Sequence, residues 1–223
     1  DRGYYAIGHD ADKRPIDALA SNMGHCLWAG IVSAERAPSV ARRLLSDELF
    51  SGWGVRTLGT SMASYNPISY HCGSVWPHDN ALVASGLMRY GFVDEAHRII
   101  AAMLDAADVA DGRLPELFAG VSRDDVGVPV SYPTSCSPQA WAAATPLLFL
   151  RLLLRFDPQV RRDRLWCAPA LLPGMTRLDL AGIPLAGRRV SVHVDPTGWR
   201  IDGLGDELEV ITHPREPLTA EAT

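Results

Sequence analysis

The sequence has no cluster of positive charge and no long hydrophobic run. It carries 21 Lys and Arg against 26 Asp and Glu, for a net charge of -5, and its basic runs are no longer than pairs such as Arg42-Arg43. A nucleic-acid surface needs a concentrated positive patch, so we expect no nucleic-acid partner. The apolar run 140–150 is about half of the roughly 20 residues that span a bilayer, so we expect no membrane partner either.

Closely spaced cysteines are also lacking. The four cysteines form no Cys-x-x-Cys pair, which excludes the common zinc patterns and a dense disulfide framework. This usage favours a reducing, cytoplasmic location. The chain has no signal peptide, and its opening at Asp1-Arg2-Gly3 is typical of the interior of a domain, so we expect a fragment of a longer protein.

What is present describes a globular chain. Its 223 residues are 47% hydrophobic, enough to bury a substantial core. Apolar residues at helical spacing, with capping residues, proline and glycine near the ends, predict five helices. They cover residues 23–31, 34–45, 77–90, 93–108 and 138–155, the last with Ser137 as cap and Pro138 at its first position.

The rest of the chain divides into long loops and short strands. Residues 51–74 and 112–136 are much longer than typical loops, and loops of this length are usually functional. Alternating residues between Gly and Pro turns predict short antiparallel strands at 177–180, 183–185, 188–194 and 198–201. Residues 213–223 have the composition of a disordered tail.

Glu116 is the first candidate for catalysis. It lies in the second long loop among Leu114, Pro115 and Leu117. Apolar neighbours remove water from a carboxylate and so raise its pKa, which makes it a better proton acceptor. The alternative is a structural carboxylate that bonds a backbone amide or a nearby arginine.

A second candidate region is the segment 65–80, which is dense in aromatic and polar side chains. Aromatic faces stack on the C–H face of a sugar ring, while Asn, His and Asp bond its hydroxyls, so the segment favours a carbohydrate. Each member also has a structural alternative: Trp76 as a core residue, His71 and His78 as bonded loop histidines, and Asp79 as a first-turn carboxylate. The histidines lack metal-ligand spacing, so we expect no metal.

Several of these motifs occur in one order along residues 1–172. In that order the chain resembles bacterial glycogen-debranching proteins of the amylo-α-1,6-glucosidase type. The motifs are Ser21-Asn22-Met23-Gly24-His25, Gly52-Trp53-Gly54-Val55-Arg56-Thr57, the segment 65–80, Leu114-Pro115-Glu116-Leu117 and Ser135-Cys136-Ser137-Pro138-Gln139-Ala140-Trp141.

The resemblance implies an all-α fold: a partial (α/α)6 toroid of helical hairpins over 1–172, its C-terminal half, followed by a small antiparallel β appendage at 173–212. It also implies an inverting hydrolase of α-glucans, an α-1,6-glucosidase of the debranching type without a cofactor. In this family Glu116 matches the general base, and the general acid lies upstream. We therefore expect the missing N-terminal half of the same chain as a partner and no activity from this segment alone.

The expected substrate-binding residues are Arg56, Tyr70, His71, Trp76, His78, Asp79 and Gln139. Arg56 could instead form a loop ion pair, and Gln139 could cap its helix. Three rival functions stay open. They are a related barrel enzyme for another α-glucoside such as trehalose or an oligosaccharide, a catalytically silent carbohydrate-binding half-barrel, and a generic helical interaction domain that binds no saccharide.

Overall fold

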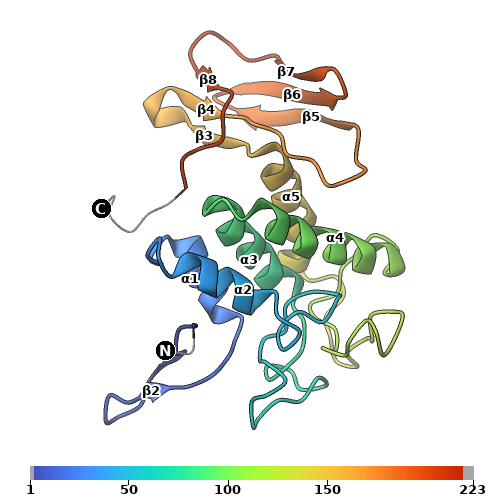
Figure 1. The fold of residues 1–223 in the computed structure, drawn as a ribbon. Helices are drawn as coiled ribbons and strands as arrows, with labels where there is room; N and C mark the ends of the chain where they lie inside the picture. Colours follow the sequence, from blue (N-terminus) through green and yellow to red (C-terminus); the bar gives the residue numbers. More distant parts are fainter. Residues whose placement is uncertain (1–2, 218–223) are drawn as a thin grey trace. The chain divides into compact units, whose positions relative to one another are not determined.

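The computed structural model describes residues 3–217 (Figure 1). The chain forms two compact units, the first running up to Leu148 and the second from Phe149 to Glu216. The boundary therefore falls inside the last helix, whereas the sequence suggested a division near residue 172. Most of the tail expected at 213–223 lies outside the described residues.

The expectation of an all-α partial toroid is wrong, because the fold is mixed α/β. Across residues 3–217 there are five α-helices and eight strands in three sheets, with 30% helix and 20% strand. Four strands lie in residues 1–172, the part expected to be helical: Gly8–His9, Pro15–Ile16, Asp157–Gln159 and Arg164–Trp166. With two or three residues each, they are too short to show the alternation by which strands are recognised.

The five helices themselves are close to prediction. They are α1 (Asn22–Ala29), α2 (Ala37–Leu44), α3 (Pro77–Arg89), α4 (Val93–Val109) and α5 (Ala140–Leu154). Pro77 opens α3, and Gly30 ends α1 in the left-handed conformation that glycine favours. Helix α5 begins two residues after the predicted Pro138. A two-strand hairpin, β1 (Gly8–His9) with β2 (Pro15–Ile16), precedes α1.

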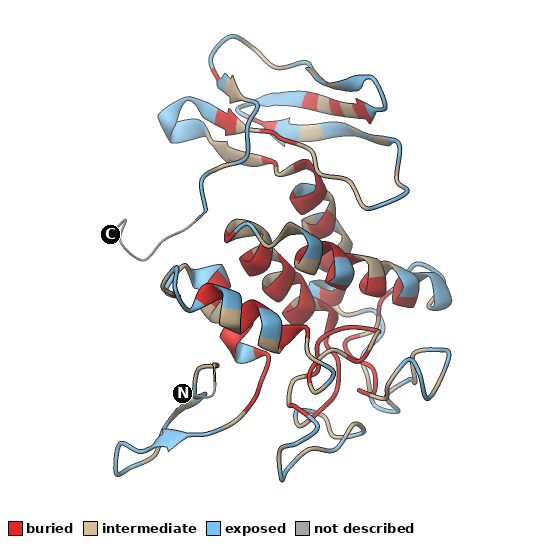
Figure 2. Cartoon of the chain, viewed as in Figure 1, coloured by how far each residue is buried: buried red, intermediate tan, exposed pale blue. Residues whose placement is uncertain are grey.

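Helix α3 is the centre of the first unit and packs against α1 and α4. Buried residues concentrate on the faces that these helices turn toward one another (Figure 2). The α1–α3 contact is especially close, because both helices carry glycine there. A Cβ on Gly24 would lie 2.6 Å from Val83 Cγ2, and a Cβ on Gly86 would lie 2.6 Å from the backbone nitrogen of Trp28. Neither position has room for a side chain.

The second unit contains two three-stranded sheets and a core of its own. β3 (Asp157–Gln159) pairs with β4 (Arg164–Trp166), which pairs in parallel with β8 (Glu209–Ile211). β5 (Leu178–Leu185), β6 (Arg188–Asp195) and β7 (Gly198–Asp202) form an antiparallel meander. The two predicted strands at 177–180 and 183–185 are one strand, β5, with a register shift between Leu180 and Ile183.

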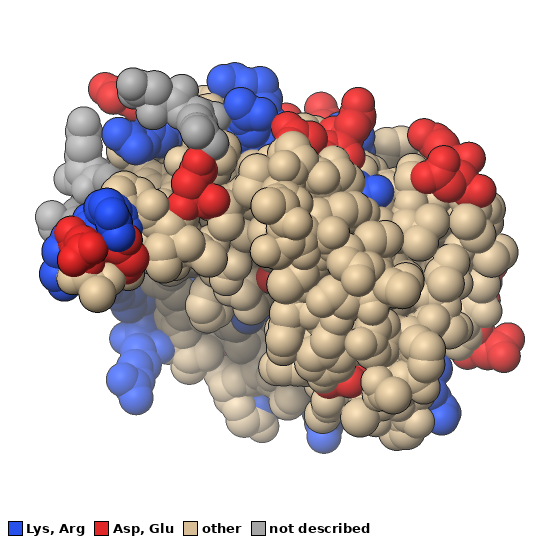
Figure 3. All heavy atoms as spheres, turned by 90° about the horizontal axis from the view of Figure 1, so that it is seen from below, with Lys and Arg blue, Asp and Glu red and all other residues tan. Residues whose placement is uncertain are grey.

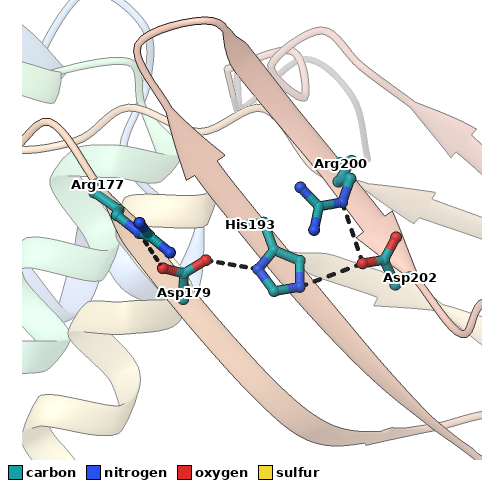
Figure 4. A network of polar contacts seen from close by, with 5 residues as sticks. All are labelled: Arg177, Asp179, His193, Arg200 and Asp202. Atoms are coloured by element: carbon teal, nitrogen blue, oxygen red, sulfur yellow. Dashed lines mark hydrogen bonds and ion pairs between the residues drawn. The ribbon is translucent and has the colours of Figure 1, made fainter.

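The inner face of the meander is apolar and its outer face is charged. Val190, Val192 and Val194 of β6 point into a core that also contains Leu154 and Leu165. On the outer face, one imidazole lies between two carboxylates, with an arginine beyond each (Figure 4). The ladder is Arg177, Asp179, His193, Asp202 and Arg200, with His193 Nδ1 2.6 Å from Asp179 Oδ1 and His193 Nε2 3.3 Å from Asp202 Oδ2.

We predict that Gly86→Ala lowers the free energy of unfolding by about 1–3 kcal/mol, because the new methyl group would meet the α1 backbone rather than a flexible side chain. Urea denaturation followed by circular dichroism measures the change. Gly127→Ala is the matched control, since a Cβ there has nothing within 4 Å. Equal stability of Gly86→Ala and the control would contradict the close packing of α1 on α3.

Candidate functional site

The two long loops meet at the start of α3. Val75 forms isolated β-bridges with both Arg56 and Phe118, and Phe118 forms another with Ser131. The loops approach so closely that a Cβ on Gly120 would lie 1.7 Å from the carbonyl oxygen of Gly73. Only glycine fits at this crossing, which fixes the second loop, and Glu116 with it, against the first.

The Glu116 carboxylate lies at this junction and is 6% exposed. Tyr70 donates its hydroxyl to Oε1 at 2.7 Å, and the backbone N–H of Cys136 donates to Oε2 at 3.2 Å. The Gln139 side chain also bonds the carboxylate. The Glu116 N–H in turn donates to the Cys136 carbonyl at 2.9 Å, so backbone and side chain are both fixed.

These donors lower the pKa of Glu116, with the Tyr70 hydrogen bond as the largest cause and the Cys136 N–H next. The expectation that apolar neighbours raise this pKa is therefore wrong. Leu114, Leu117 and Phe118 are buried, but the carboxylate itself receives hydrogen bonds that favour its charged form. Glu116 is consequently an ionised acceptor at neutral pH.

Tyr70 connects Glu116 to a cluster of aromatic side chains. Its ring contacts Trp76 edge-on at 4.9 Å, His71 edge-on at 4.6 Å and Tyr132 at 5.7 Å between centroids. The hydrogen bond to Glu116 raises the pKa of Tyr70 to about 12, so its hydroxyl keeps its proton and remains a donor. The cluster holds that hydroxyl in place.

The exposed aromatic surface belongs to Trp141, not to Trp76. Trp76 is 4% exposed, and its indole N–H donates to the Tyr70 carbonyl and to Ser74 Oγ. Trp141 is 45% exposed, and its ring stacks on His78 at 3.8 Å with an interplanar angle of 3°. His71 is exposed and lies parallel to Trp76 at 5.6 Å.

Arg56 is buried behind the loops. Its Nε donates to the Gly120 carbonyl at 2.7 Å, and its Nη1 donates to the Asp47 carbonyl at 3.1 Å. Burial lowers the pKa of this guanidinium. Arg56, itself in the first loop, therefore binds the backbone of the second loop at Gly120 and of the segment after α2 at Asp47, and the structure does not bring its side chain together with the aromatic cluster.

Asp79 and Gln139 also have defined partners. Asp79 Oδ1 lies 2.6 Å from Nε2 of His25 on α1. Gln139 Oε1 accepts the N–H of Ala140, the first residue of α5, at 2.8 Å, while its side chain also bonds Glu116. Both alternatives for Gln139, a cap and a residue directed at the site, thus occur together.

The first long loop is poor in charge. Between residues 51 and 74 the sequence has one charged residue, Arg56, and it is buried. Seen from the side on which the loops lie, charged side chains lie mainly toward the rim, and the middle consists of other residues (Figure 3). Among residues 3–217 no group of three or more His, Cys, Asp and Glu could hold a metal ion. Within the same range, no helix is long and apolar enough to cross a membrane.

The sequence did not single out Tyr132, Trp141 or His25 as residues of the site. Trp141 is the last residue of the motif that runs from Ser135 to Trp141, and Tyr132 lies three residues before the motif begins, so this motif was the available signal for both. His25 had no such signal, because its partner Asp79 is 54 residues away in the chain.

Comparison with known proteins identifies the family. The family of mannosylglycerate hydrolase MGH1-like glycoside hydrolase domains matches residues 1–121, which include Glu116 and the aromatic segment before α3. No curated protein matches the chain.

Several solved structures share the fold. The GH63 mannosylglycerate hydrolase from Thermus thermophilus is 24% identical; its complex with Tris superposes with a TM-score of 0.57 over 68% of this chain and 34% of that one. Its complex with glucose gives 0.51 over 62% and 31%. Neutral trehalase from Saccharomyces cerevisiae is 18% identical, with a TM-score of 0.50 over 73% and 28%.

The chain thus spans about a third of the length of the solved structures that it matches. Its resemblance to debranching proteins holds at the coarser level of a glycosidase fold, and the family match covers more than half of the sequence. The chain belongs to the family of mannosylglycerate hydrolase MGH1-like glycoside hydrolase domains.

Proposed function

We propose that this chain carries the general base of a glycoside hydrolase that cleaves an α-glycosidic bond with inversion, and that Glu116 is that base. The observation that carries the proposal is the Glu116 carboxylate, ionised and held by Tyr70 and Cys136 beside an aromatic cluster. A base must be unprotonated and fixed in direction to take a proton from a water molecule. Both conditions are met here.

In an inverting reaction the base activates water on the face of the sugar opposite the leaving group. A second carboxyl, roughly 6.5–9.5 Å away, protonates the leaving oxygen. Asp79 is a poor choice for this acid, because it is buried and paired with His25. We propose that the acid comes from polypeptide upstream of this segment, which is the partner the site requires; the solved relatives, about three times as long, support this.

For the sugar, we propose a site bounded by Trp141, His71, His78 and Tyr70. The exposed ring of Trp141 offers an apolar face for stacking, and the two imidazoles offer hydrogen bonds to hydroxyls. Arg56 and Trp76 contribute by holding the loops, and Gln139 by bonding the base.

Two substrate classes are favoured, and trehalose is tested as a third substrate. An α-1,6-branched glucan follows from the resemblance seen in the sequence, and the charge-poor first long loop is compatible with a neutral glycan. Mannosylglycerate, a mannoside of the small acid glycerate, is favoured by the family match. The test is to assay full-length protein on limit dextrin, mannosylglycerate and trehalose and to follow the released anomer by proton NMR. The substrate that is cleaved identifies the class. Release of the anomer with retained configuration would reject inversion.

We predict that Glu116→Gln lowers kcat about 10²–10⁴-fold in the full-length protein, because the amide cannot accept the proton of the attacking water. Substrate binding should persist, since glutamine keeps the size and most contacts of glutamate. Steady-state kinetics and calorimetric binding measure both. A variant as active as wild type would remove Glu116 from the mechanism.

We also predict that the 223-residue chain alone releases no sugar from any of the three substrates, because it holds a base without its acid. Overnight incubation of purified chain with each substrate, followed by sugar analysis, is the measurement. Turnover that disappears in Glu116→Gln chain would show that the acid lies within this segment.

A third prediction concerns Tyr70→Phe. Loss of the hydroxyl removes the main cause of the lowered pKa of Glu116, so that pKa rises and the acidic limb of the kcat/KM profile moves to higher pH. At neutral pH, kcat/KM falls about tenfold from the lost charge-assisted bond. Tyr65→Phe is the control, because the Tyr65 hydroxyl bonds the Gly120 carbonyl instead. An acidic limb that moves equally in both variants would contradict the assignment.

A further inference from the structure

Asp79 is a buried carboxylate with one oxygen unsatisfied. Its side chain is 9% exposed; Oδ1 pairs with His25 Nε2 at 2.6 Å, and Oδ2 has no hydrogen-bond partner among the described residues. The neighbouring His78 Nδ1 is likewise buried without a partner. A carboxylate in such surroundings is costly unless a positive group compensates it. The group available is His25.

His25 and Asp79 differ in solvent exposure. The His25 side chain is 37% exposed, so the pair hides its carboxylate and presents its imidazole. The hydrogen bond that His25 donates to the Asp79 carboxylate raises the pKa of His25 despite partial burial, which favours the protonated ring. Burial lowers the pKa of His78, which favours the neutral ring. His25 therefore favours the protonated ring, and the nearby His78 favours the neutral ring.

The pair also lies beside the proposed sugar site. His78 follows Pro77 at the start of α3, directly before Asp79, and its ring stacks on Trp141. The charges of Asp79, His25 and Glu116 all act on His78, so the pair and the proposed base both lie near this imidazole. The α1–α3 contact at Gly24 and Gly86 holds His25 at this distance from α3.

We propose that His25 is a further substrate-binding residue, positioned by Asp79, whose imidazole donates a hydrogen bond to a sugar hydroxyl oxygen beside the Trp141–His78 stack. The inference rests on the proposed function, because it names a contact within the same site. Asp79 does not touch the sugar; it orients His25 and favours the form with an N–H on both ring nitrogens. The ligand class is a neutral monosaccharide unit.

The test is glucose binding by calorimetry across pH, in full-length protein carrying Glu116→Gln. We expect His25→Gln in this background to weaken glucose binding about tenfold at neutral pH, the loss of a charge-assisted hydrogen bond. His213→Gln is the matched control, since His213 is an exposed histidine of the second unit that bonds the Pro214 carbonyl. Equal affinity of His25→Gln and the control would overturn the proposal.

Asp79→Asn tests positioning rather than contact. In the parent protein, glucose affinity falls as pH rises through the raised pKa of His25; without the carboxylate that fall moves to lower pH. The titratable groups near His25 are Asp79 and His78 of α3, Glu116, which is glutamine in this background, and Cys26 of α1, whose thiol pKa burial raises. An unchanged pH profile in Asp79→Asn would reject the positioning role.

A measurement on unmutated side chains covers the case in which a variant fails to fold. The His25 Cε1–H resonance, assigned in the Glu116→Gln protein, should shift on glucose addition, and no shift would overturn the contact. A wrong assignment of Glu116 as the base is distinguishable from a wrong assignment of His25. It would appear as hydrolysis of substrate by the Glu116→Gln protein itself, and glucose binding at His25 could still be measured.

Discussion

The meeting of two long loops at Val75 is the constraint on which the site depends. Bridges from Val75 to Arg56 and Phe118 join segments that are otherwise without regular structure. The crossing of Gly120 over the Gly73 carbonyl, and the buried guanidinium of Arg56 in the first loop, which bonds the Gly120 carbonyl of the second, fix this arrangement. Because Glu116 lies two residues before Phe118, its carboxylate is positioned by backbone geometry before any side chain acts on it.

The negative charge of Glu116 is stabilised by hydrogen bonds rather than by an oppositely charged group. Glu116 is kept ionised by the Tyr70 hydroxyl and the Cys136 N–H, both neutral donors, so its negative charge remains available to a water molecule. Asp79 is different, because His25 compensates it directly. These two carboxylates therefore have distinct environments, and distinct environments are how proteins assign distinct chemical roles to similar groups.

The second unit is stabilised by a hydrophobic core of its own. Its strands bury Val190, Val192 and Val194 in a core of their own, and its charged ladder on the outer face consists of exposed groups. Exposed ion pairs contribute little to stability, so the apolar core must hold this unit together. These strands belong to a compact unit that runs from Phe149 to Glu216.

The sequence by itself determined all five helices to within about three residues, the two long loops and Glu116 as the leading candidate, because helical periodicity, proline and glycine act locally. It gave the wrong fold class, since β3, β4 and β8 are short and find their partners only in space. It also gave the wrong direction for the pKa of Glu116, because the donors Tyr70 and Cys136 lie 46 and 20 residues away. Tertiary structure alone decided which tryptophan is exposed and which histidine meets Asp79, for the same reason: these contacts join residues that the chain keeps far apart.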